Sequence, residues 1–182
     1  MIRIKLLILL LCLFGCGCNN EPQPKDMLQR EIIMPNIALL DKLCLSDIES
    51  DSFYSMKPKI FVYYNLRGCM SCRLSDLRYW QLRINEIKNS DIKNQVEFIF
   101  ILRGNRHNKH FMAALNETGF RHTIYLDSKG EFERINKLPQ DHIFHTFLLD
   151  GDNKIRLIGS PLYNTTFWNR YKTRIQEYNK PQ

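Results

Sequence analysis

The chain has 182 residues, of which 44% are hydrophobic and 25% are charged, and its formal net charge is +7. This length allows one domain of ordinary size with a short extension, and the composition excludes a disordered chain or a repeat array. The basic residues are scattered without a block of like charges, which is typical of a solvated surface, so no nucleic-acid partner is expected.

The amino terminus has the pattern of an export signal. Arg3 and Lys5 precede an unbroken apolar run of nine residues, Leu6 to Phe14. A basic start followed by a short apolar run is typical of a secretory signal peptide, and nine residues are too few to span a bilayer as a helix. The sequence therefore predicts a signal peptide at residues 1–15, and a buried first strand or helix is the alternative.

The residues Leu13-Phe14-Gly15-Cys16 resemble the box that precedes the lipidated cysteine of bacterial lipoproteins. The resemblance implies that Cys16 carries acyl chains such as palmitate and becomes the mature amino terminus, with Cys18 as the alternative. Several acyl chains on one residue give stable membrane anchoring. Residues 16–35 are then the lipidated terminus and an extended tether, and residues 36–182 form a domain on the bacterial cell membrane, facing the periplasm or the exterior.

The first half of this domain predicts a strand followed by a long helix. Residues 37–54 form a short helix or strand region, and residues 59–65 (KIFVYYN) are a compact apolar run typical of a buried strand. From Cys69 onward the apolar spacing changes to steps of three and four residues, which predicts one buried face of a helix. That face comprises Leu74, Leu77, Trp80, Ile84 and Ile87.

The second half alternates in the same way. A strand at 96–102 is followed by a basic loop, a helix that stops at Gly119, and three short strands, the last two joined by a turn at 150–153. An amphipathic helix closes the chain and is expected to bury Phe167, Trp168, Tyr171 and Ile175. This order predicts an α/β fold with a central mixed β-sheet and helices on both faces.

Cys69 and Cys72 occupy the turn between the first strand and the long helix. The unpaired N–H groups and the positive end of the helix dipole favour a thiolate there, and Arg67 and Arg73 add positive charge. A thiolate at Cys69 would attack a disulfide, and Cys72 is spaced to resolve the mixed disulfide that results. The pair is therefore a candidate redox site.

Other uses of the pair follow different patterns. Haem attachment requires a histidine directly after the second cysteine, where Arg73 stands. Structural zinc requires four ligands, for which only Cys44 and scattered histidines are present. Metal binding and a purely structural disulfide remain as alternatives, and no cofactor is implied.

Residues 36–178 resemble the thioredoxin-like fold, a three-layer sandwich, and most closely the TlpA-type branch of membrane-anchored thiol–disulfide oxidoreductases. The resemblance rests on KIFVYYN, on CMSC opening a long helix, and on HTFLLDGDNKIRLIG before a final helix. It implies that Cys69 attacks and Cys72 resolves. The expected partners are protein thiols or disulfides of the cell envelope, and the chain is expected to be a monomer.

The sequence departs from that family at three positions. Gly68 and Ser71 stand where the family has tryptophan and proline, and Phe144 stands where it has a cis-proline beside the disulfide. Because a cis bond without proline costs about 3 kcal/mol, the Ile143–Phe144 bond is expected to be trans. The following His145 either tunes a thiolate or is a polar residue that starts a strand.

These observations predict a lipid-anchored extracytoplasmic thiol–disulfide oxidoreductase. Two other functions use the same fold. One is a redox-inactive binding module, and the other is a copper or zinc chaperone that uses Cys69 and Cys72 with His145.

Overall fold

The computed structural model describes residues 24–43, 45 and 52–179. The predicted signal peptide and the candidate lipidation residues Cys16 and Cys18 lie outside these ranges. Within them, no helix combines the length and the apolar character needed to cross a membrane.

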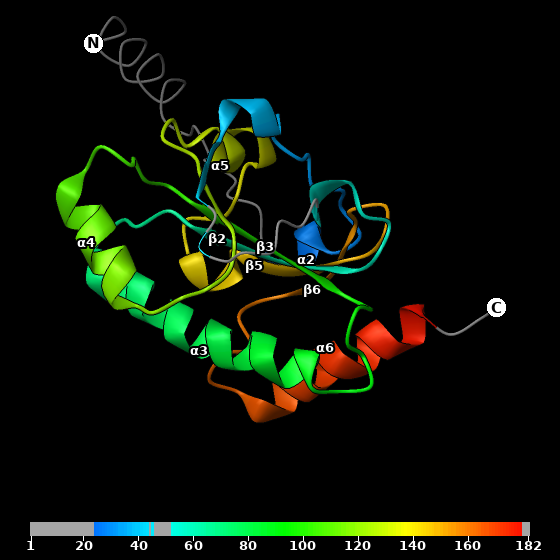
Figure 1. The fold of residues 1–182 in the computed structure, drawn as a ribbon. Coiled ribbons are helices and arrows are strands. Elements are labelled where there is room, and N and C mark those ends of the chain that lie inside the picture. Colours follow the sequence, from blue (N-terminus) through cyan, green and yellow to red (C-terminus); the bar gives the residue numbers. More distant parts are fainter. Residues whose placement is uncertain (1–23, 44, 46–51, 180–182) are drawn as a thin grey trace, which may run out of the picture.

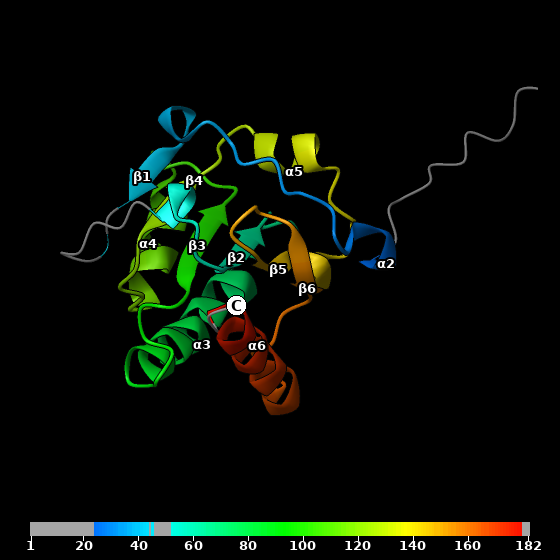
Figure 2. The ribbon, with the colours of Figure 1, turned by 90° about the vertical axis from the view of Figure 1, so that its right-hand side faces the viewer.

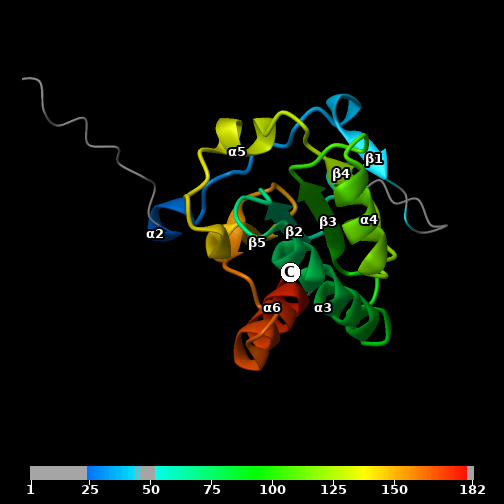
Figure 3. The same ribbon diagram turned by 90° about the vertical axis from the view of Figure 1, so that its left-hand side faces the viewer.

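A mixed sheet of six strands in the order β1-β4-β3-β2-β5-β6 forms the centre of the described chain (Figure 2). Figure 3 shows the same sheet from the opposite side. β2 and β3 are parallel, as are β3 and β4, whereas the remaining neighbouring pairs are antiparallel. The strands are β1 (Asp41–Leu43), β2 (Lys59–Tyr64), β3 (Glu97–Leu102), β4 (Ile124–Leu126), β5 (Thr146–Leu149) and β6 (Ile155–Ile158). The predicted strands at 59–65 and 96–102 are confirmed.

The central strand β2 is buried along its whole length, as its continuous apolar sequence predicts. Successive side chains point to opposite faces of a strand. Ile60 and Val62 accordingly join the core on one face of the sheet, while Phe61 and Tyr63 join the core on the other.

On the first face, the sheet is covered by α3 (Met70–Lys88), α4 (Lys109–Glu117) and α6 (Thr165–Tyr178) (Figure 1). The five residues predicted for the inner face of α3 are its buried residues. Trp80 is fully buried, and its indole N–H donates to the Tyr64 hydroxyl at 2.9 Å. In α6, Trp168, Tyr171 and Ile175 are buried and Phe167 is half-buried.

The opposite face is covered by α5 (Glu131–Asn136) and by the short helix α2 (Pro24–Met27) (Figure 2). α5 was not among the elements predicted above. The Asp127 carboxylate fixes its start, because it accepts the backbone N–H groups of Glu131 and Phe132, both at 2.9 Å. Helices therefore cover both faces of a mixed sheet, as predicted.

The segment after α2 lies beside the start of β6 and the turn that precedes it. The Gln29 N–H donates to the Ile155 carbonyl, the Ile155 N–H donates to the Arg30 carbonyl, and the Ile32 N–H donates to the Asn153 carbonyl, each at 2.9 Å. Met27 and Ile32 are buried. The part of the expected tether that the structure describes is thus packed against the sheet.

The region predicted as a short helix or strand at 37–54 contains both types of element. It has a 3₁₀ turn η1 (Ile37–Leu39), the short strand β1 and a second 3₁₀ turn η2 (Ser52–Tyr54). β1 pairs antiparallel with β4.

Candidate active site

Cys69 and Cys72 lie where β2 passes into α3, at the carboxyl end of the central strands. The connecting loop turns through two left-handed residues, Leu66 (φ 56°) and Gly68 (φ 77°). Glycine adopts this conformation without a Cβ clash, which accounts for Gly68 directly before the first cysteine. The Asn65 side-chain oxygen also accepts the Arg67 N–H at 3.2 Å and so holds the loop.

The two cysteines form a disulfide, with 2.13 Å between the sulfurs and 5.3 Å between the Cα atoms. Cys69 is the N-cap of α3, and its Sγ accepts the backbone N–H of Cys72 at 3.3 Å. The Ser71 hydroxyl lies 3.4 Å from the same sulfur. Both cysteines are exposed to solvent. The disulfide is therefore accessible, with a helix N-terminus directed at one of its sulfurs.

The two arginines that flank the pair lie in different surroundings. Arg67 binds the Glu133 carboxylate of α5 at 3.1 Å, and Arg103 approaches the same carboxylate at 3.6 Å. Arg73 is half-buried, and its positive charge helps to lower the pKa of His142, after the larger effect of burial. Much of the positive charge of Arg67 is thus neutralised by an ion pair, whereas Arg73 keeps its charge beside the helix N-terminus.

His145 lies directly before β5 and is only 1% exposed. Its Nε2–H donates to the Pro139 carbonyl at 2.6 Å, while Nδ1 has no hydrogen-bond partner among the described residues. Burial lowers its pKa, so the ring is neutral at neutral pH. The Tyr63 hydroxyl, on the neighbouring β2, is also buried without a partner, and the two rings are 5.7 Å apart. Sequence reasoning missed Tyr63, because nothing distinguishes it within an apolar strand.

Phe144 ends the 3₁₀ turn η3 (His142–Phe144) and is half-buried. No cis peptide bond occurs in the part of the chain that the structure describes, so the Ile143–Phe144 bond is trans as expected. The neighbouring Ile143 is 48% exposed. An apolar side chain is therefore presented to solvent on this turn.

Asp76 and Tyr79 follow Cys72 on the same face of α3, at spacings of four and three residues. The Tyr163 hydroxyl donates to Asp76, and its ring packs edge-to-face on Tyr79 with centroids 5.1 Å apart. Burial and the Asp76 bond raise the pKa of Tyr163. Sequence reasoning missed this group because Tyr163 comes from the distant β6–α6 connection.

Among residues 24–43, 45 and 52–179, no cluster of three or more His, Cys, Asp or Glu side chains is arranged to hold a metal ion.

No protein-family model matches the chain, and no curated protein sequence matches it. Solved structures do match. A proposed protein disulfide isomerase from Bacteroides thetaiotaomicron has a TM-score of 0.51 at 21% identity, over 71% of this chain and 78% of that chain. Peroxiredoxin Q from Xanthomonas campestris has a TM-score of 0.50 at 12% identity, over 82% of this chain and 99% of that chain. At such identities the likeness concerns the fold alone. The chain has the thioredoxin-like fold, with an exposed disulfide at the amino end of its 19-residue helix.

Proposed function

We propose that the chain is a thiol–disulfide oxidoreductase that acts on protein thiols or disulfides through Cys69 and Cys72. One observation carries the proposal: the pair forms an exposed disulfide whose Cys69 sulfur is the N-cap of a long helix. A structural disulfide across three residues would close a very short loop and stabilise the fold little. An exposed disulfide in this position is instead suited to exchange.

Exchange would begin from the reduced pair when the Cys69 thiolate attacks one sulfur of a substrate disulfide. A mixed disulfide forms, and one substrate thiolate leaves. The Cys72 thiol then loses its proton and attacks Cys69, releasing the second substrate thiolate and closing the Cys69–Cys72 disulfide. The substrate disulfide gains two electrons and the cysteine pair loses two. The reverse sequence oxidises a substrate dithiol.

The local geometry favours Cys69 as the attacking group. The Cys72 N–H that points at its sulfur would donate to the thiolate, and the helix dipole acts in the same direction. The nearby charge of Arg73 adds to this effect.

The site of action proposed is the outer side of a bacterial membrane, with the lipid attached at Cys16. Support comes from the apolar run at 6–14 and the four residues that end at Cys16. Globomycin treatment of expressing cells should accumulate the unprocessed form, and Cys16→Ser should abolish labelling by radioactive palmitate, with Cys18→Ser as the matched control. Retained labelling in the Cys16 variant would contradict the anchor at this residue.

The redox function is tested with the reduced protein. We expect the pKa of Cys69, measured by the pH dependence of iodoacetamide alkylation, to lie below the value of about 8.5 for a free cysteine. Cys72→Ser should trap a mixed disulfide with a substrate peptide, and Cys69→Ser should not. An ordinary pKa, together with a disulfide that glutathione cannot reduce, would favour the redox-inactive binding module.

A further inference from the structure

A cavity lies at the other end of the sheet from the disulfide. Its volume is about 300 Å³, which is within the range of small-molecule sites. It opens beside the amino ends of β2 and β3, whereas Cys69 follows the carboxyl end of β2. Six strand residues at a rise of about 3.3 Å each separate the two sites by about 20 Å.

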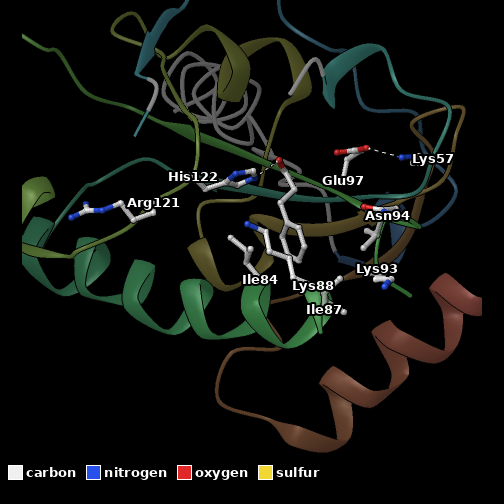
Figure 4. Close-up of a pocket in the computed structure, with 11 residues that line it drawn as sticks. Lys57, Ile84, Ile87, Lys88, Lys93, Asn94, Glu97, Arg121 and His122 are labelled. Carbon is white, nitrogen blue, oxygen red and sulfur yellow. Dashed lines mark hydrogen bonds and ion pairs between the residues drawn. The ribbon is translucent and has the colours of Figure 1, made fainter. Parts of the chain in front are cut away.

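Basic side chains from several segments surround this cavity (Figure 4). Lys88 comes from the end of α3, Lys93 from the loop that follows, and Arg121 and His122 from the segment before β4. Lys57 also lines it, and its ammonium group binds Glu97, the one carboxylate among the described lining residues, at 3.2 Å. In the described part of the chain, Lys88 and Lys93 have no carboxylate within ion-pair distance.

The carboxyl end of α3 adds a partial negative charge here, which Lys88 partly offsets. The lysines are not needed to satisfy the last helix carbonyls, however. The Ile87 carbonyl accepts the Ser90 N–H at 3.0 Å and the Ser90 hydroxyl at 2.8 Å. Their ammonium groups therefore remain available to a ligand.

The floor of the cavity is apolar. Ile84 and Ile87 reach it from α3, Val96 from the residue directly before β3, and Phe98 from β3 itself. All four side chains are more than nine-tenths buried and belong to the core that lies under α3. A ligand that fits this cavity has an apolar body with an anionic group at the rim.

The His122 side chain also lines the cavity. Its Nε2–H donates to the Phe98 carbonyl at 3.1 Å, and its ring lies edge-on to the Phe98 ring at 6.3 Å. These contacts fix the ring and leave Nδ1 without a hydrogen-bond partner among the described residues. On protonation, Nδ1–H would donate to a bound anion.

We propose that this cavity binds a small organic anion, a phosphate or carboxylate group carried on an apolar ring or short chain. Lys88 and Lys93 would hold the charge, with the protonated His122 ring donating through Nδ1–H and the isoleucines contacting the apolar body. A soluble phosphate monoester and the headgroup region of an anionic lipid share this chemistry.

Calorimetric titration with phenyl phosphate tests the proposal. We expect saturable binding, with inorganic phosphate and benzyl alcohol each binding at least tenfold more weakly because each lacks one half of the ligand. The variant Lys88→Ala/Lys93→Ala should lose at least tenfold in affinity. The control Lys109→Ala/Lys129→Ala makes the same change in net charge at exposed lysines outside the cavity and should stay within twofold.

Two further measurements locate the ligand and its source. Burial and the charge of Lys88 lower the pKa of His122, while the Phe98 carbonyl and Glu97 act in the opposite direction. In NMR titrations this pKa should rise when phenyl phosphate saturates the cavity. Phenyl phosphate should displace the protein from phosphatidylglycerol vesicles if the source is a lipid, and the protein should not bind these vesicles if the source is a soluble ester.

Absence of saturable binding, equal affinity for inorganic phosphate, or equal losses in the two double variants would overturn the proposal. The Cys69–Cys72 exchange rate should be the same in all variants, because the lysines lie about 20 Å from the disulfide. A failure of redox activity is therefore distinguishable from a failure of anion binding.

Discussion

At the scale of single residues, His145 combines burial with incomplete hydrogen bonding. One ring nitrogen donates to Pro139 while the other has no partner among the described residues. Burial lowers the pKa of this ring in the folded state, and it lowers the pKa of His122 in the same way. Unfolding would expose both rings to water, where their pKa is about 6.5.

The free energy of unfolding should therefore fall as the pH is lowered through about 6.5, because the unfolded chain then binds more protons than the folded chain. The loss ends below the folded pKa values, where both states are protonated. Urea unfolding at about pH 7 and pH 5 measures this slope. His145→Gln should flatten it, and the same substitution at the exposed His107 should not. An unchanged slope in the His145 variant would contradict this assignment.

At the scale of elements, α3 both presents the disulfide and packs on the sheet. Trp80 is its largest buried side chain, and it contacts Phe100 of β3 edge-to-face with centroids 5.8 Å apart. Near the carboxyl end of α3, Glu86 accepts the Trp168 indole N–H at 2.8 Å and the Lys172 ammonium at 2.7 Å, which ties α3 to α6. The long helix is thus fixed along its length by side chains far from the cysteines.

Trp80→Ala should reduce the free energy of unfolding by about 3–5 kcal/mol, since it leaves a large cavity and removes the bond to Tyr64. Leu82→Ala, on the exposed side of the same helix, should change it by less than about 0.5 kcal/mol. Chemical denaturation of both variants provides the comparison. Similar losses in the two would mean that α3 does not pack on the sheet through the face described.

At the scale of the whole molecule, the described segment from Met27 to Ile33 is part of the folded core. Ile32 is 1% exposed, whereas its neighbour Ile33 is 55% exposed. The side chain of Asn136, at the end of α5, donates to the Ile33 carbonyl at 3.0 Å and accepts the Ile33 N–H at 2.8 Å. Backbone and side-chain contacts together dock this segment.

Ile32→Ala should cost about 2–5 kcal/mol of stability, and Ile33→Ala less than about 0.5 kcal/mol, because only the first side chain is buried. Both variants keep the backbone hydrogen bonds. Thermal unfolding at one protein concentration would measure the difference. Equal midpoints would show that the segment is not docked in solution.

The features that sequence analysis predicted are those with local patterns. The inner face of α3 has a helical period, and β2 and β3 are continuous apolar runs. The cysteine pair lies where β2 passes into α3. α5 was missed because six residues are too few for a period, and its start depends on the Asp127 carboxylate and on Gly130 at φ 68°. The basic cavity brings together four separate segments, so no local pattern indicates it.

The segment along β6 has a consequence for self-association. A sheet whose last strand is uncovered presents free N–H and C=O groups, which can template pairing with another chain. Here Gln29 and Arg30 occupy the N–H and C=O groups of Ile155, the first residue of β6, and Ile32 binds Asn153 in the turn before it. At the opposite margin, β1 is only three residues long. The docked segment thus covers the start of this edge, and a change that loosened it would expose Ile155 to pairing with another chain and should lower solubility while leaving the disulfide in place.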